Sequence, residues 1–177
     1  VIPSPAVGRA LRWYRFGINA TQPEDQFQYF WFAIEILAEY QKASEKVTDK
    51  CPTCKSPLYC ETCETYPTHR PYAKQAIRAL IQTVDKDCNE ETLDALDKAR
   101  NALMHGATLK DIEGKLPEPR EDIVDILGKV LFKALLHQFP REIFNRAIQM
   151  GNPSTYLHRT VTGIAHVQTV VPLGEDG

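Results

Sequence analysis

The sequence predicts an all-α protein, an up-and-down bundle of about five helices, and three observations support this class. Apolar residues recur every three to four positions through most of the chain, which is the spacing of one helix face. Residues typical of helix ends bracket several of these segments. The pattern breaks only in a cysteine-rich stretch and in a final stretch rich in Thr and Val. We therefore expect a helical domain at residues 1–150, an insertion at 44–70 and an extended C-terminal tail at 151–177.

The first helix is expected from about Ala6 to Asn19, after two prolines. One face is apolar and consists of Leu11, Tyr14 and Ile18. Another face carries three arginines, Arg9, Arg12 and Arg15. Such a basic stripe is usually a solvated face, and we assign it no function.

The second helix is expected from near Thr21 to about Ala43. Its start, Thr21-Gln22-Pro23-Glu24, resembles a capping box. The helix is apolar on most of its circumference, and only a narrow stripe is polar: Gln28, Glu35, Glu39 and Lys42. A helix of this kind must be covered on most sides. Because a small bundle can hardly cover it alone, we expect burial against a second copy of the chain, in a homodimer.

The insertion contains the pattern C-x2-C-x5-C-x2-C, formed by Cys51, Cys54, Cys60 and Cys63. Each C-x2-C turn can direct two thiolates at one ion, and two turns complete a tetrahedral site. A closed four-thiolate site has no open position for substrate, so the pattern predicts structural Zn²⁺. Disulfides and an iron–sulfur cluster are the alternatives. His69 is a further candidate ligand that four cysteines make unnecessary, and Cys88 is expected to be a buried small residue.

Three further helices are expected at residues 72–84, 89–106 and 117–139, and a short one at 141–150. Asn89 is a good N-cap, and Gly106 suits the position after a helix end. The third helix has a basic stripe that we expect to be a solvated face: Arg70, Lys74 and Arg78.

The formal net charge is −2, which argues against a protein that coats nucleic acid non-specifically. The chain has no apolar run of about 18 residues and no signal-peptide pattern, so we expect a cytoplasmic protein with no membrane partner. It begins without methionine, which leaves open that it is part of a larger chain with an additional domain.

The helix at residues 89–106 ends with Arg100, Asn101 and His105 on one side. An arginine can hold phosphate charge while an imidazole moves a proton, so this set suits phosphodiester chemistry without a metal. A plainer interpretation is that Arg100 forms a salt bridge and His105 completes the helix end. Glu35 is a candidate partner for Arg100, although we favour an exposed position for it on the polar stripe.

The sequence Arg100-Asn101-(x3)-His105 matches the R-x4-6-H motif, and the chain resembles the HEPN superfamily. The aromatic-rich segment Phe30–Glu35 is similar to an early helix of bacterial HEPN domains. The resemblance covers about Ala6 to Met150 and implies a bundle that dimerises, so that two copies of the motif face one cleft.

The resemblance also implies a function. Arg100 would hold the scissile phosphate, His105 would act as general acid or base, and Asn101 would position these groups. The chain would then be a metal-independent RNA endonuclease that leaves 2′,3′-cyclic phosphates. The resemblance points to a toxin with an antitoxin partner or to an anti-phage defence effector. The alternative is a non-catalytic HEPN binding, scaffold or regulatory module stabilised by structural zinc.

Overall fold

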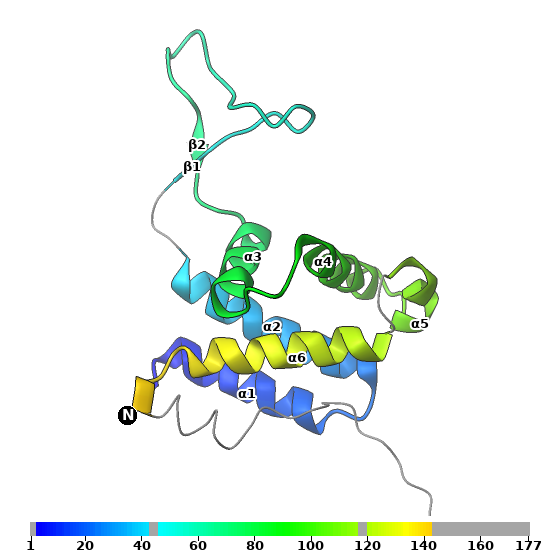
Figure 1. Cartoon of the computed structure of the whole chain (residues 1–177). Coiled ribbons are helices and arrows are strands. Elements are labelled where there is room, and N and C mark those ends of the chain that lie inside the picture. Colours follow the sequence, from blue (N-terminus) through cyan, green and yellow to red (C-terminus); the bar gives the residue numbers. More distant parts are fainter. Residues whose placement is uncertain (1–2, 43–45, 117–119, 143–177) are drawn as a thin grey trace, which may run out of the picture.

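The computed structural model describes residues 3–42, 46–116 and 120–142 and confirms the all-α bundle (Figure 1). The described elements are α1 (Pro5–Asn19), α2 (Pro23–Gln41), β1 (Val47–Thr48), β2 (Thr68–His69), α3 (Ala73–Val84), α4 (Glu90–Met104), α5 (Leu109–Ile112), the 3-10 helix η1 (Glu113–Lys115) and α6 (Arg120–Leu136). The sequence pattern did not predict α5, η1 or the two short strands. The expected tail at 151–177 lies outside the described residues, as does nearly all of the helix expected at 141–150.

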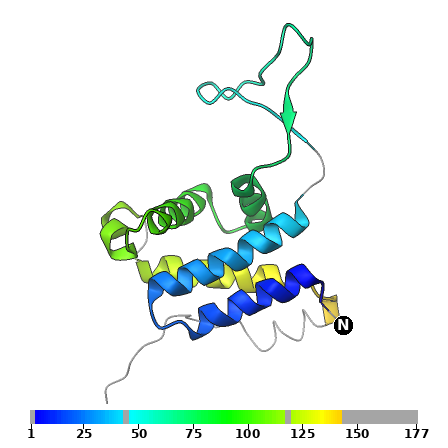
Figure 2. The same ribbon diagram turned by 180° about the vertical axis from the view of Figure 1, so that it is seen from behind.

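Helix α2 is the central element of the bundle, and it packs against α1, α3, α4 and α6 (Figure 2). Every residue of α2 from Gln26 to Ala38 is buried or half-buried in the single chain. Four helices of the same chain therefore cover most of the broad apolar surface that suggested a dimer. The apolar excess of α2 is a consequence of its central position, and it does not require a second copy.

The ends of two helices show which capping signals the chain uses. The Asn89 side chain accepts a hydrogen bond from the Thr92 amide at 2.8 Å, and Gly106 has a φ of 83°, as expected at these positions. The capping box expected at Thr21 is wrong. Because proline favours the first helical position, α2 begins at Pro23 and its N-cap residue Gln22 makes no side-chain cap bond. Glu24 instead accepts a hydrogen bond from the Leu109 amide at 3.1 Å, which ties α2 to α5.

The cysteine insertion projects from the bundle between α2 and α3 (Figure 1). Its stem is an antiparallel pair of strands in which Val47 lies opposite His69 and Thr48 opposite Thr68. The amide of Asp49 extends the stem with a 2.8 Å hydrogen bond to the Pro67 carbonyl. The stem places the cysteines away from the helical core.

Replacing Gly17 with alanine is expected to destabilise the fold by about 1–3 kcal/mol, because the site cannot accept a methyl group. A Cβ atom there would lie 2.3 Å from Cε1 of the Phe30 ring, which is fully buried between α1 and α2. Gly8 is the matched control on the same helix, since a Cβ atom at Gly8 would meet nothing within 4 Å. Gly8→Ala should stabilise the protein by about 0.5–1 kcal/mol through helix propensity. Urea unfolding measures both variants, and a Gly17→Ala protein as stable as Gly8→Ala would contradict the packing described.

Candidate functional site

Arg100 lies in the last turns of α4 and is held by residues of two helices. Its Nη1 donates a hydrogen bond to Oδ1 of Asn101 at 3.3 Å, and its Nη2 lies 3.6 Å from Oε1 of Glu35 on α2. The same Glu35 oxygen accepts a 2.9 Å hydrogen bond from Nε1 of Trp31. The expectation that Glu35 lies on an exposed stripe is wrong, because the packing of α4 on α2 leaves its side chain 33% exposed and next to the guanidinium. Arg100 itself is 36% exposed, so it remains accessible to a ligand.

His105 is the C-cap residue of α4, and its backbone position is fixed. Its amide donates hydrogen bonds to the carbonyls of Asn101 and Ala102 at 3.2 and 3.1 Å. The following Gly106 adopts the left-handed conformation that ends the helix. The residue His105 is exposed, as is Asn101. The structure thus brings Arg100 and Asn101 into contact and places His105 at the same helix end.

A small hollow beside Arg100 separates α2 from α4. Its lining residues are Phe27, Gln28, Trp31, Phe32, Arg100, Leu103 and Met104. Its volume of about 10 Å³ is close to the space needed for one water molecule, so it cannot hold a nucleotide. Met104 at its rim is 55% exposed. The hollow therefore cannot enclose a substrate by itself, and a substrate site at this helix end needs residues from outside the hollow.

A row of aromatic side chains leads from this hollow across α1 and α2. The ring of Phe32 lies 5.1 Å from that of Trp13, and the ring of Trp13 lies 5.6 Å from those of Phe16 and Tyr29. Phe16 is 45% exposed, and Phe32, Trp13 and Tyr29 are half-buried. We call these four residues the aromatic row. It gives the monomer a partly exposed apolar surface that is continuous with the motif.

The four cysteines of the insertion form two turns of the same design, Cys51–Cys54 and Cys60–Cys63. Each turn is followed by a residue in the left-handed conformation, Lys55 with φ 61° and Glu64 with φ 51°. All four thiols are free. Hydrogen bonds from the side chain and amide of Ser56 lower the pKa of Cys54 to about 7, and the amide of Cys63 lowers the pKa of Cys60.

The two cysteine turns do not meet in the described part of the chain, where no three His, Cys, Asp or Glu side chains are grouped closely enough to hold a metal ion. The zinc site expected from the spacing therefore remains a prediction. His69 has a different role from the ligand role considered for it. Its Nδ1 contacts Oδ1 of Asp49, and its ring stacks on Tyr72 at 4.2 Å, so it joins the stem of the insertion to the start of α3.

Two residues of the basic stripe, Lys74 and Arg78, pair with acidic residues of α4, so the expectation of a solvated face is wrong for them. Arg78 pairs with Glu90 at 2.8 Å and with Asp97 at 2.6 Å, and it also contacts Asp94. Lys74 lies 2.9 Å from Asp97. The Arg78 guanidinium lowers the pKa of Asp94 below its ordinary value. These ion pairs hold α3 against α4, so Lys74 and Arg78 are engaged within the fold.

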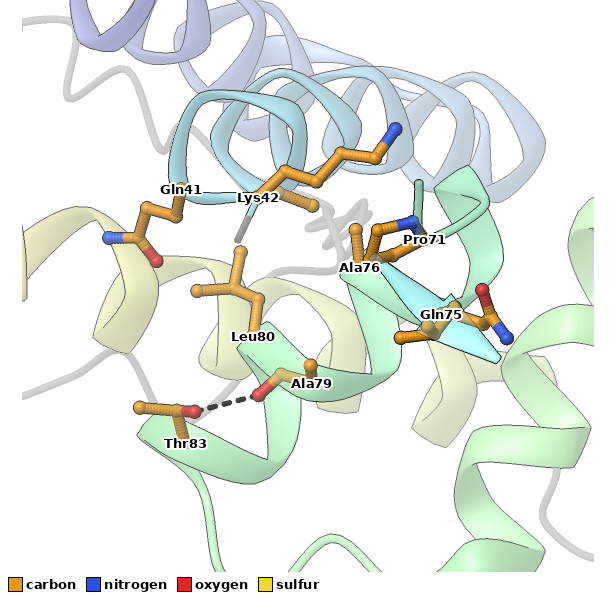
Figure 3. Close-up of a pocket in the computed structure, with 10 residues that line it drawn as sticks. Gln41, Lys42, Pro71, Gln75, Ala76, Ala79, Leu80 and Thr83 are labelled. Carbon is orange, nitrogen blue, oxygen red and sulfur yellow. Dashed lines mark hydrogen bonds between the residues drawn. The ribbon is translucent and has the colours of Figure 1, made fainter. Parts of the chain in front are cut away.

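A larger pocket of about 350 Å³ lies where the end of α2 meets the base of the insertion and α3 (Figure 3). Ala38, Ala76 and Leu80 contribute apolar surface, and Gln41, Lys42 and Gln75 contribute polar groups. The Thr83 hydroxyl at one side is already bonded to the Ala79 carbonyl at 2.7 Å. The pocket shares no lining residue with the hollow beside Arg100.

Within the described ranges, none of the helices combines the length and apolar character that a membrane crossing requires. A family model described as methylamine utilization protein MauJ matches residues 10–130, which include α2, the cysteine insertion and the motif at 100–105. Comparisons with curated proteins and with solved structures give no significant match.

Proposed function

The chain belongs to the methylamine utilization protein MauJ family, and we propose that it is a metal-independent RNA endonuclease of the HEPN type. The family description names a metabolic setting and no reaction, so the proposed reaction rests on the residues themselves. The observation that carries it is the placement of Arg100, restrained by Glu35 and Asn101, at the same helix end as the exposed His105.

Arg100 is proposed to bind the scissile phosphate. A planar guanidinium offers five donors, and its contacts with Glu35 and Asn101 are long, at 3.6 and 3.3 Å. The phosphodiester monoanion can compete for such a group because charge-assisted bonds to phosphate are shorter and stronger. The hydrogen bond from Trp31 keeps the Glu35 carboxylate in place, so Glu35 acts as a positioning residue for the guanidinium.

The proposed reaction is attack of the ribose 2′-oxygen on the adjacent phosphorus. A neutral imidazole removes the 2′-hydroxyl proton while the bond from phosphorus to the 5′-oxygen breaks, and a protonated imidazole donates a proton to that leaving oxygen. The products are a 2′,3′-cyclic phosphate and a 5′-hydroxyl. Arg100 balances the negative charge that builds up on the phosphoryl oxygens. We assign the two proton transfers to the His105 residues of two copies of the chain.

The second copy is proposed to pack on the aromatic row and Met104. This surface adjoins Arg100, and the hollow there is too small to enclose a substrate in one chain. A twofold axis near this surface places the same patch of both copies in contact and brings both motifs to one cleft. The role as a toxin or defence effector, and its control by an antitoxin, follow from the HEPN resemblance and are part of this proposal.

Replacing Phe16 with glutamate is expected to convert the dimer to a monomer and to abolish RNA cleavage, because a charge would be buried in the interface. Phe16 is 45% exposed in the single chain, so the monomer fold should tolerate the change. Tyr40→Glu is the control, since Tyr40 is 54% exposed on α2 and lies outside the aromatic row. Size-exclusion chromatography with light scattering gives the mass. A wild-type monomer that cleaves RNA, or a Phe16→Glu dimer, would contradict this interface.

The test of the activity itself is incubation of the purified chain with single-stranded and structured RNAs, followed by analysis of the product ends. Cleavage with cyclic phosphate ends is expected. Absence of cleavage across varied RNAs by a folded dimer would overturn the nuclease proposal.

A second candidate function, a non-catalytic binding module, is favoured by the pocket of about 350 Å³ at the base of the insertion. Sites for small molecules typically have volumes of about 300–1,000 Å³ and a mainly apolar lining. Ala79 lines this pocket and is exposed, so Ala79→Phe would fill it with little effect on the core. A ligand whose binding is lost in Ala79→Phe, together with no RNA cleavage by the wild type, would support this second function.

A further inference from the structure

The cysteine insertion lacks a hydrophobic core of its own. Not one residue from 46 to 70 is buried in the structure. Large apolar side chains are instead exposed there: Leu58 is 42% exposed, Tyr59 52% and Tyr66 53%. A segment that buries so little apolar surface cannot offset the entropy of ordering its chain, and small structures of this kind usually need a disulfide or a metal ion.

The two cysteine turns are built alike, and each carries its own set of backbone hydrogen bonds. In the first turn the Lys55 amide donates to the Cys51 carbonyl at 2.9 Å, and the Cys51 amide donates to Ser56 at 2.8 Å. In the second turn the Cys60 amide donates to Thr65 at 2.9 Å. An antiparallel bridge closes each turn, between Lys50 and Pro57 and between Cys60 and Thr65.

Each turn is followed by a residue with a left-handed backbone conformation, which indicates that the sequence itself determines both turns. Lys55 and Glu64 have positive φ angles, although neither is glycine, and such a conformation costs free energy for a residue with a side chain. In both turns this residue comes directly after the second cysteine. Each turn thus holds two thiols on a fixed backbone, which is half of a tetrahedral thiolate site.

We propose that one Zn²⁺ ion binds Cys51, Cys54, Cys60 and Cys63 together and brings the two turns into a single four-thiolate site. The residues between Cys54 and Cys60 extend to at most about 20 Å, so neither turn can move far from the other. Soft thiolates favour zinc over the hard cations magnesium and calcium. Closure also brings the exposed Leu58 and Tyr59, which link the turns, against the metal-bound core.

The ion in this proposal is structural and takes no part in phosphodiester chemistry. Four thiolates leave no open coordination position, and the free energy of metal binding becomes folding free energy of the insertion. The inference is independent of the proposed nuclease activity, since it concerns metal content and local order.

Metal analysis of the full chain and three variants tests the site. The wild type and the control Cys88→Ser should each hold one zinc per chain, because Cys88 lies outside the insertion. The double variants Cys51→Ser with Cys54→Ser, and Cys60→Ser with Cys63→Ser, should each lose the metal, because two thiolates do not complete the site. Substitution with Co²⁺ should give the absorption of a tetrahedral tetrathiolate centre. Two ions per chain, metal retained in either double variant, or a disulfide within each turn would overturn the proposal.

Hydrogen exchange of the full chain tests the closure. Removing the metal with a chelator should increase amide exchange across residues 46–70 and leave α2 and α4 unchanged. Unchanged exchange in the insertion would show that the ion does not bring the turns together.

Discussion

Replacement of His105 by alanine is expected to lower the rate of RNA cleavage by about 10²–10⁴-fold, the usual contribution of general acid–base catalysis. His105 is exposed at the C-cap of α4, and its amide makes the contacts that end the helix, so the backbone can keep its conformation without the imidazole. Single-turnover cleavage of a labelled RNA, with enzyme in excess, measures the chemical step apart from product release.

The matched control for His105 is His137→Ala. His137 is also exposed and also follows the end of a helix, α6, but it has no part in the motif. It should cleave RNA at the wild-type rate, and both variants should unfold at the wild-type temperature. Equal cleavage by His105→Ala and His137→Ala would show that the imidazole at position 105 is not catalytic.

Replacement of Arg100 by alanine is expected to lower the cleavage rate by about 10²–10³-fold, as for loss of one preorganised group that stabilises transition-state charge. Arg100→Lys should recover little of this loss, because an ammonium group cannot present the planar fork of donors that phosphate binds. Lys98→Ala is the control, since Lys98 is an exposed cation of the same helix. Single-turnover rates for the three variants, measured at saturating RNA, separate the chemical effect from weaker binding.

Two outcomes would weaken the assigned role of Arg100. A Lys variant as active as the wild type would show that only the positive charge at position 100 matters, and not the planar guanidinium. Loss of activity in Lys98→Ala equal to that in Arg100→Ala would point to non-specific attraction of RNA. Glu35 should retain its 2.9 Å bond with Trp31 when Arg100 is removed, so a large loss of thermal stability is not expected.

The helical bundle could be predicted from local signals, and its tertiary arrangement could not. Apolar spacing and the caps at Asn89 and Gly106 placed the main helices to within a few residues. The apolar surface of α2 suggests an interface between copies, whereas α1, α3, α4 and α6 of the same chain cover most of it. A sequence pattern shows that a face must be covered, and it does not show by which element.

The candidate site was predicted in its residue types and not in its contacts. Spacing on one helix identifies Arg100, Asn101 and His105. It offers Glu35 as a partner of Arg100 but cannot decide for this pairing over an exposed position, because the pairing depends on how α4 crosses α2. Trp31, which holds Glu35, lies in the aromatic-rich segment Phe30–Glu35, and that pattern does not predict its hydrogen bond. The acidic residues that engage Arg78 come from α4 and likewise have no local signature.

The most direct test of the central claim is a comparison of two oligonucleotides that differ at one ribose. An RNA cleaved by the wild-type dimer with EDTA present is made again with a 2′-deoxyribose on the 5′ side of the cleaved bond. Mass spectrometry should find a 2′,3′-cyclic phosphate and a 5′-hydroxyl from the RNA, and no cleavage at the deoxy position. Cleavage at that position, or a reaction with the RNA that requires an added divalent ion, would contradict metal-independent attack by the 2′-hydroxyl at Arg100 and His105.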